Sequence, residues 1–304
     1  MKNPLNRRLP RELKSEIGKY LVILILLIAT IGFVSGFLVA DGSMLTAYNE
    51  SFEKYNIEDG HFTVAKKMNP AQKKNVEALG VHVYDLFYVD EPLITNESTL
   101  RIFEDRQEVD KVCLMEGKMP EKDGEIAIDR MYADNNGLKA GDMLASSDRR
   151  WTITGLVALS DYSALFSDNN DSMFDSIKFG VAIVTPEAFA QFESSALTYQ
   201  YAWQYDQSPN DDREEKEMSD DFMSDLNGII ALNSYTPRYL NQAINFTGED
   251  MGSDRGMMIV LLYMVIVIMA FVFGVTTSNT ISKEANVIGT LRASGYTKIG
   301  RAHV

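Results

Sequence analysis

Two long runs of apolar residues dominate the hydrophobic pattern of this 304-residue chain. Residues 20–40 (YLVILILLIATIGFVSGFLVA) and residues 256–275 (GMMIVLLYMVIVIMAFVFGV) contain no charge. At a rise of about 1.5 Å per residue, either run spans a hydrocarbon core of about 30 Å as a helix. The runs therefore predict two transmembrane helices. Residues 1–19 precede the first run, which is longer than the apolar core of a signal peptide, so we expect a retained anchor.

The polar segment between the runs alternates strand and helix patterns. Residues 61–67 and 81–93 each predict a strand, and residues 69–80 predict a helix with Asn69 as N-cap and Gly80 as its stop. Further along, the pattern predicts a strand over residues 125–128, a helix from Asp129 that stops at Gly137, and two more strands, one of them around residues 151–155. The charged run 206–226 is expected to lead into a polar helix. The fold class predicted is α+β, a mixed domain flanked by two transmembrane helices.

Basic residues gather at both ends of the chain and predict its orientation. Residues 1–19 contain six Lys or Arg against two Glu, and residues 276–304 contain four against one. Because cytoplasmic flanks of membrane helices carry excess Lys and Arg, we expect both ends to be cytoplasmic and residues 41–255 to be extracytoplasmic. The outer segment holds 40 acidic and 19 basic residues, which argues against binding nucleic acid.

The residues that usually carry catalysis or bind cofactors form no recognisable set in this sequence. Cys113 is the only cysteine, and the three histidines are scattered without the spacing of a zinc site. No phosphate-binding Gly-x-x-x-x-Gly-Lys loop and no Gly-x-Ser-x-Gly nucleophile motif occurs. Asp168, Asn170 and Ser172 have the first spacings of a calcium loop, but its glycine and final glutamate are missing. We therefore expect no enzymatic activity, no cofactor and no metal.

Small residues four positions apart occur in both apolar runs. Gly32 and Gly36 form a Gly-x-x-x-Gly pair, and Ala270 and Gly274 form a similar pair in the second run. Such pairs let helix backbones approach closely in a membrane, although chance alone often produces them. We expect helix packing at these positions.

The segment after the second run is amphipathic. On a helix, Val287, Ile288, Leu291 and Gly295 gather toward one face, and the charged residues Lys283, Glu284, Arg292 and Lys298 lie off it. Such a stripe can rest on lipid headgroups or dock in a groove of a partner protein. The residues alone leave both interpretations open.

The same segment resembles the region that follows the second transmembrane helix in FtsX/MacB-type ABC transporter permeases. An acidic residue, Ile-Gly, Leu-Arg-Ala and a further Gly recur there in the order that Glu284, Ile288, Gly289, Leu291, Arg292, Ala293 and Gly295 follow here. Residues 116–142 with residues 151–157 resemble the extracytoplasmic core domain of these permeases. The basic leader is similar to that of the large FtsX-like permeases of Gram-positive bacteria.

The resemblance implies a domain order. It consists of a cytoplasmic basic leader (residues 1–19), a first transmembrane helix (20–40), a MacB-like core domain (41–255), a second transmembrane helix (256–275) and a coupling region (276–298). Members of this family continue into further transmembrane helices, so we expect the natural protein to continue past Lys298. Residues 299–304 can be translated from a sequencing-adapter strand, and we expect them to be non-native.

The resemblance also implies a function and partners. The chain would be the permease subunit of an ABC transporter in the cell membrane, coupled through residues 284–295 to a cytoplasmic ATPase subunit and paired with a second permease copy or half. Its outer domain would act on lipid, peptide or envelope partners. The alternative is a membrane-anchored sensory receptor with a ligand-binding outer domain, although Gly289 and Gly295 fit poorly in a heptad-patterned signalling helix.

Overall fold

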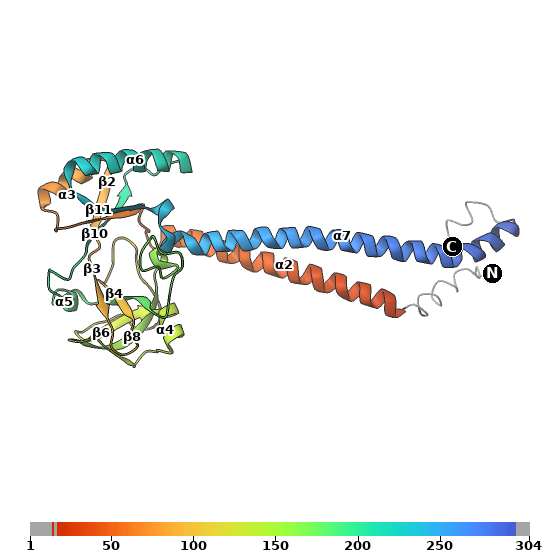
Figure 1. The fold of residues 1–304 in the computed structure, drawn as a ribbon, viewed down its shortest axis with the longest axis horizontal. Coiled ribbons are helices and arrows are strands. Elements are labelled where there is room, and N and C mark those ends of the chain that lie inside the picture. Colours follow the sequence, from red (N-terminus) through yellow and green to blue (C-terminus); the bar gives the residue numbers. More distant parts are fainter. Residues whose placement is uncertain (1–13, 15–16, 296–304) are drawn as a thin grey trace. The chain divides into compact units, whose positions relative to one another are not determined.

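The structure is a computed structural model that describes residue 14 and residues 17–295. It divides into two compact units, which Figure 1 draws together. The helical unit comprises the chain up to Met44 and from Met251 onward, and the outer domain comprises Leu45–Asp250.

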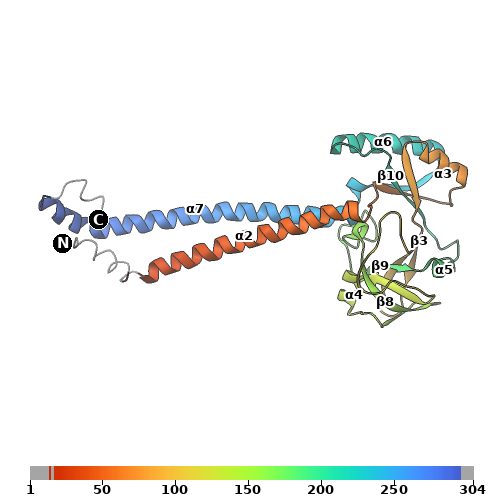
Figure 2. The same ribbon diagram turned by 180° about the vertical axis from the view of Figure 1, so that it is seen from behind.

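Two helices contain the apolar runs and extend well beyond them. These are α2 (Ile17–Lys54) and α7 (Gln242–Ala293), which Figures 1 and 2 trace as unbroken ribbons. Apolar side chains are exposed on all sides of both, and Phe271, for example, is 72% exposed. A helix that is apolar all round suits a lipid environment better than the surface of a soluble domain. By length and composition, both helices can cross a membrane.

The first sheet of the outer domain is antiparallel and covered on one face by two helices. Its strands, in spatial order, are β11 (Leu232–Pro237), β1 (Gly60–Val64), β10 (Tyr199–Tyr205) and β2 (Val81–Asp85). Alternate residues such as Phe62 and Trp203 pack against α3 (Pro70–Glu77) and α6 (Asp212–Ile229). The opposite face is polar, as the period of two along a strand requires. This sheet and its two helices are called the first lobe.

The second sheet has seven strands and holds the larger core. Its order is β3 (Tyr88–Pro92), β4 (Thr99–Glu104), β9 (Phe179–Val184), β6 (Glu125–Asp129), β8 (Arg150–Ala158) and β5 (Cys113–Gly117), and β7 (Met143–Ala145) also pairs with β8. The pairs β4–β9 and β6–β8 are parallel. The central strand β9 is buried along its whole length. With α4 (Arg130–Asn136) and α5 (Pro186–Phe189), this sheet forms the second lobe.

Residues 81–93 do not form the single strand that the sequence predicts. They form β2 in the first sheet and β3 in the second, because alternation breaks at two consecutive apolar residues. Leu86 packs with Val109 and Ala202, whereas the ring of Phe87 contacts the rings of Tyr199 and Tyr201. The chain crosses between the lobes at this break.

Other local predictions are confirmed. The side chain of Asn69 accepts a hydrogen bond from the Gln72 N–H, so α3 begins with a full capping box. Asp129 caps α4, and Gly137 ends it in the left-handed conformation at φ 66°. The polar helix is present as α6, but it begins earlier than predicted: only residues 206–211 of the charged run precede it, and residues 212–226 belong to the helix, whose N-cap is Asp211. The mixed α+β domain between two apolar helices is therefore the fold that the sequence predicts.

Candidate functional site

The predicted coupling residues lie at the end of α7. The helix continues through residues 284–293, and Gly295, at φ +87°, follows its last turn. Gly289, Arg292 and Ala293 are exposed. The side chains of Glu284, Val287, Ile288 and Leu291 lie outside the described part of the structure. Docking of this segment on a partner stays a prediction.

The small residues of the apolar runs are open to their surroundings. A Cβ added to Gly32, Gly36 or Gly274 would meet no described atom within 4 Å outside its own helix, and Ala270 is exposed. These positions therefore form no close helix contact among the described residues. Packing against a further helix stays a prediction.

The outer ends of α2 and α7 meet in a set of contacts that we call the helix junction, formed by residues 48–59 and 238–248. The Tyr48 hydroxyl donates a hydrogen bond of 2.8 Å to the Ile244 carbonyl. Beside it, Gly248 leaves so little room that an added Cβ would lie 2.6 Å from Cε1 of Tyr48. The two helices are thus in direct contact within the outer domain.

Backbone and side-chain hydrogen bonds tie α7 to a loop of the second lobe. This loop follows the 3-10 helix η2 (Ser160–Tyr162). The Ser163 hydroxyl lies 2.9 Å from the Ala243 carbonyl oxygen and 2.8 Å from that of Ile244, and the Thr247 hydroxyl donates to the Ser163 carbonyl at 3.1 Å. The Ala164 N–H also donates to the Ala243 carbonyl, at 3.1 Å. The first turns of α7 are therefore attached to this loop by hydrogen bonds.

The end of α2 is tied to a different loop of the second lobe, between β4 and β5. The N–H groups of Asp110 and Lys111 donate to the carbonyls of Asn56 and Tyr55, at 3.0 and 2.8 Å. The Asn56 side chain donates back to the Glu108 carbonyl at 2.7 Å. Each helix therefore has its own attachment to the second lobe.

Arg238 links the junction to the first lobe. It lies in the 3-10 helix η3 (Arg238–Leu240), just before α7. Its guanidinium is 2.8 Å from Asp59, in the segment that follows α2, and 3.5 Å from Glu215 on α6. These ion pairs therefore connect the segment after α2 and the segment before α7 with α6, one of the two helices that cover the first sheet.

Four charged side chains are buried where the two lobes meet the end of α2. Glu58, Arg106, Asp110 and Asp161 are each at most 6% exposed, and we call them the buried charge cluster. Arg106 and Asp161 pair through two contacts of 2.6 and 3.2 Å. Oδ1 of Asp110 accepts a 2.9 Å hydrogen bond from the Glu58 N–H. Oε1 of Glu58 lies 2.5 Å from Nδ1 of His61. Burial, together with the Glu58 carboxylate, raises the pKa of Asp110 well above its usual range.

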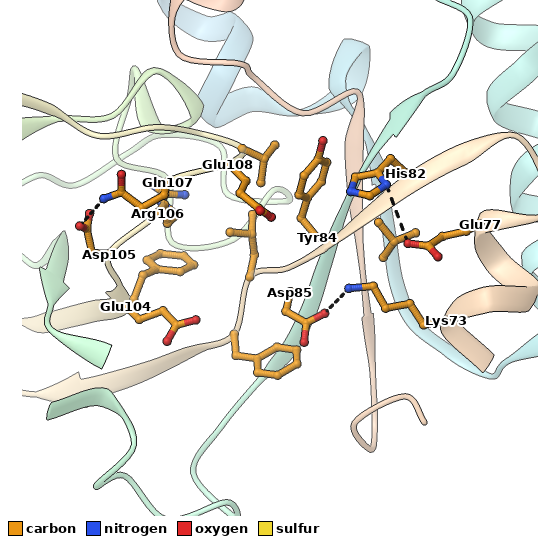
Figure 3. Close-up of a pocket in the computed structure, with 15 residues that line it drawn as sticks. Lys73, Glu77, His82, Tyr84, Asp85, Glu104, Asp105, Arg106, Gln107 and Glu108 are labelled. Carbon is orange, nitrogen blue, oxygen red and sulfur yellow. Dashed lines mark hydrogen bonds and ion pairs between the residues drawn. The ribbon is translucent and has the colours of Figure 1, made fainter. Parts of the chain in front are cut away.

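A cleft of about 440 Å³ lies on one side of this cluster, between α3 and β2 of the first lobe and the end of β4 with its following loop. Figure 3 shows carboxylates on both walls. Lys73 pairs with Asp85 at 2.9 Å, and His82 lies 3.9 Å from Glu77. Burial and the Asp85 carboxylate raise the pKa of Glu104. This cleft is acidic overall.

A second cleft, of about 350 Å³, is lined by the polar face of the first sheet and by the loop after η2. Glu58 and Asp161 of the buried charge cluster line it together with His61 and Arg101. Arg101 is engaged by both oxygens of Asp90 at 2.8 Å and lies over the Tyr88 ring. Among the described residues, no group of three or more His, Cys, Asp or Glu is placed to hold a metal ion.

Two solved extracytoplasmic domains match a little over half of the chain. The periplasmic region of MacB from Actinobacillus actinomycetemcomitans matches with a TM-score of 0.33 and 9% identity, over 55% of this chain and 83% of that one. The extracellular domain of the ABC-type transporter YknZ from Gram-positive bacteria matches with a TM-score of 0.32 and 12% identity, over 56% and 92%. No protein-family model and no curated sequence matches the chain.

Sequence reasoning did not find the buried charge cluster. Its members come from three separate stretches of the chain, namely the segment after α2, the loop between β4 and β5, and η2. Each looks like an ordinary surface charge in its own context. Only the long-range contacts bring them together, such as the Arg106–Asp161 pair across 55 positions. The local sequence around Asp110 gives no signal either, because the charged residues Glu108 and Lys111 lie beside it.

Proposed function

We propose that the chain is the permease subunit of an ABC transporter of the FtsX/MacB type, which passes ATP-driven motion from a cytoplasmic ATPase to the outer domain. One observation carries this proposal. Each membrane helix runs unbroken into the helix junction and is attached there, by its own hydrogen bonds, to a different loop of the second lobe. The resemblance of residues 284–295 to the coupling region of these permeases supports it.

Relative movement of α2 and α7 would strain one contact, the ion pair between Arg106 and Asp161. The loop attached to α2 carries Arg106, and the loop attached to α7 follows Asp161 directly. Sliding one helix along the other would therefore pull on the bidentate Arg106–Asp161 pair, which is buried and costly to break. Movement of the helices would change the two clefts beside this pair.

The remaining parts of the proposal concern orientation and partners. The basic flanks support an orientation with both chain ends in the cytoplasm and the outer domain outside. The partners are the ATPase, a second permease copy or half, and the lipid bilayer. The outer domain acts on lipid, peptide or envelope partners.

The test uses the whole chain, co-expressed with a candidate ABC ATPase subunit. Leu291→Asp places an unpaired carboxylate in the proposed apolar contact and should reduce co-purification of the ATPase more than tenfold, since truncation of a buried interface leucine alone costs about 1–3 kcal/mol. Thr290→Asp, the neighbouring residue off the apolar stripe, is the matched control. Equal recruitment and equal coupled ATPase activity in both variants would remove the proposal.

Arg292→Glu separates docking on a protein from contact with lipid. If the segment only rests on headgroups, this variant weakens association with anionic vesicles and leaves ATPase recruitment unchanged. If it docks, recruitment falls.

A further inference from the structure

The buried charge cluster holds more negative than positive charge. Three carboxyl groups, on Glu58, Asp110 and Asp161, share one guanidinium, on Arg106. That guanidinium is already engaged by both oxygens of Asp161. Oδ2 of Asp110, Oε2 of Glu58 and Nε of Arg106 are buried and have no hydrogen-bond partner among the described residues. An ionised carboxylate without a cationic partner at such a place would cost several kcal/mol.

We propose that Asp110 carries a proton at neutral pH, and that this proton holds the end of α2 against the second lobe as a pH-sensitive joint. The proposal concerns the outer domain alone and does not depend on the permease role. Asp110 is fully buried and belongs to the loop that receives the end of α2. Among the described residues, the one cation that acts on it is Arg106, which is committed to Asp161. A proton on the Asp110 carboxyl therefore removes the excess charge.

The groups around Asp110 come from every element that meets at the joint. Like charges are Glu58, from the segment after α2, and Asp161, from η2, and the opposing charge is Arg106, from the same loop. The phenol of Tyr84 on β2 is also close enough to interact with Asp110. The imidazole of His61 on β1 reaches Glu58 and is partly exposed to the second cleft. Asp110 therefore faces two carboxylates and one cation that already has a partner.

The pH dependence of the joint follows from where the proton sits. When the joint opens, Asp110 meets water and its pKa returns to about 4. Consider the pH range between about 4 and the raised pKa of Asp110 in the closed joint. Across this range, loss of the Asp110 proton alone should raise the fraction of molecules with an open joint about tenfold per pH unit. Above the raised pKa the population levels off. The joint is therefore tightest in acid and loosens as the pH rises.

The direct test is infrared difference spectroscopy of the full chain in detergent micelles. A protonated carboxylic acid has a carbonyl stretch separate from that of carboxylates. At pH 7, wild type should show such a band that Asp110→Asn lacks. Asp105→Asn, at a partly exposed aspartate of the same loop, should keep the band and serves as the matched control. A band at pH 7 that is identical in wild type and Asp110→Asn would overturn the proposal.

A second variant keeps the proposal testable if Asp110→Asn does not fold. Glu58→Gln removes the nearest like charge, so the Asp110 band should disappear at a lower pH than in wild type. An unchanged titration in Glu58→Gln would also overturn the proposal.

Hydrogen exchange measures the opening itself. The Glu58, Asp110 and Lys111 amides are donors in the joint, and their exchange, corrected for the intrinsic rate, reports its opening. We expect the tenfold rise per pH unit in wild type and a flat profile in Asp110→Asn. Equal slopes in the two proteins would show that another group controls the joint.

Discussion

Gly248 sits where α7 crosses the Tyr48 ring of α2, and replacing it with alanine tests the helix junction. The added Cβ would lie 2.6 Å from Cε1 and 2.9 Å from Cζ of Tyr48. Ordinary contact between carbons is about 3.5–4.0 Å, so the ring must retreat by about 1 Å. That movement would stretch the 2.8 Å hydrogen bond from the Tyr48 hydroxyl to the Ile244 carbonyl beyond its useful range.

Three terms decide the size of the effect. Overpacking in a tight contact costs about 1–3 kcal/mol, and loss of the hydrogen bond costs about 1 kcal/mol. Alanine in a helix gains about 1 kcal/mol over glycine. We therefore expect Gly248→Ala to destabilise the outer domain by about 1–3 kcal/mol. Gly252 lies one turn later, and a Cβ added there would meet no atom within 4 Å. Gly252→Ala therefore gains only the helix propensity of alanine and should be neutral or stabilising.

The assay is thermal unfolding of the purified chain in detergent, followed by tryptophan fluorescence. Both tryptophans, Trp151 and Trp203, are buried in the outer domain. For a domain of roughly 200 residues, each kcal/mol shifts Tm by about 2–4 °C. Placing Gly248→Ala in a Tyr48→Leu background should remove most of its cost. Equal Tm values for the Gly248 and Gly252 variants would refute the close contact of the helices.

Two further predictions concern the second lobe and the topology. Burial raises the pKa of Asp129, the N-cap of α4, to about 6. Stability should therefore fall as the pH rises from about 4 to about 6, and Asp129→Asn should remove that part of the fall, which urea unfolding at several pH values would measure. If residues 41–255 are extracytoplasmic, an impermeant thiol reagent applied to intact cells should label a cysteine at position 211 but not at position 15 in a Cys113→Ser background. The reverse pattern would invert the topology.

Local signals in the sequence predicted the elements well. Asn69, Asp129 and Gly137 each act through their own few neighbours, as N-caps or as a left-handed helix stop, so their roles can be read without the fold. The two apolar runs can also be interpreted without the fold, because length and composition are enough to identify a helix that can cross a membrane.

The arrangement of those elements could not be predicted in the same way. β1 pairs with β10 and β11, which lie more than a hundred residues further along the chain, and no local pattern encodes that choice. The break at Leu86 and Phe87 depends on which core receives each side chain. The helix junction and the buried charge cluster follow from these long-range pairings, and so they emerged only with the structure.

The strand order of the first sheet also determines when this lobe can be completed during synthesis. β1 and β2 are made early but are not neighbours, since β10 lies between them. β10 and β11 leave the ribosome only after the whole second lobe, and roughly a hundred residues take about 5–20 s to synthesise. Until then β1 and β2 have unpaired edges and an uncovered apolar face, the state most open to aggregation and proteolysis. Newly exported chains should therefore be most vulnerable in the first lobe, while the second lobe is already folded.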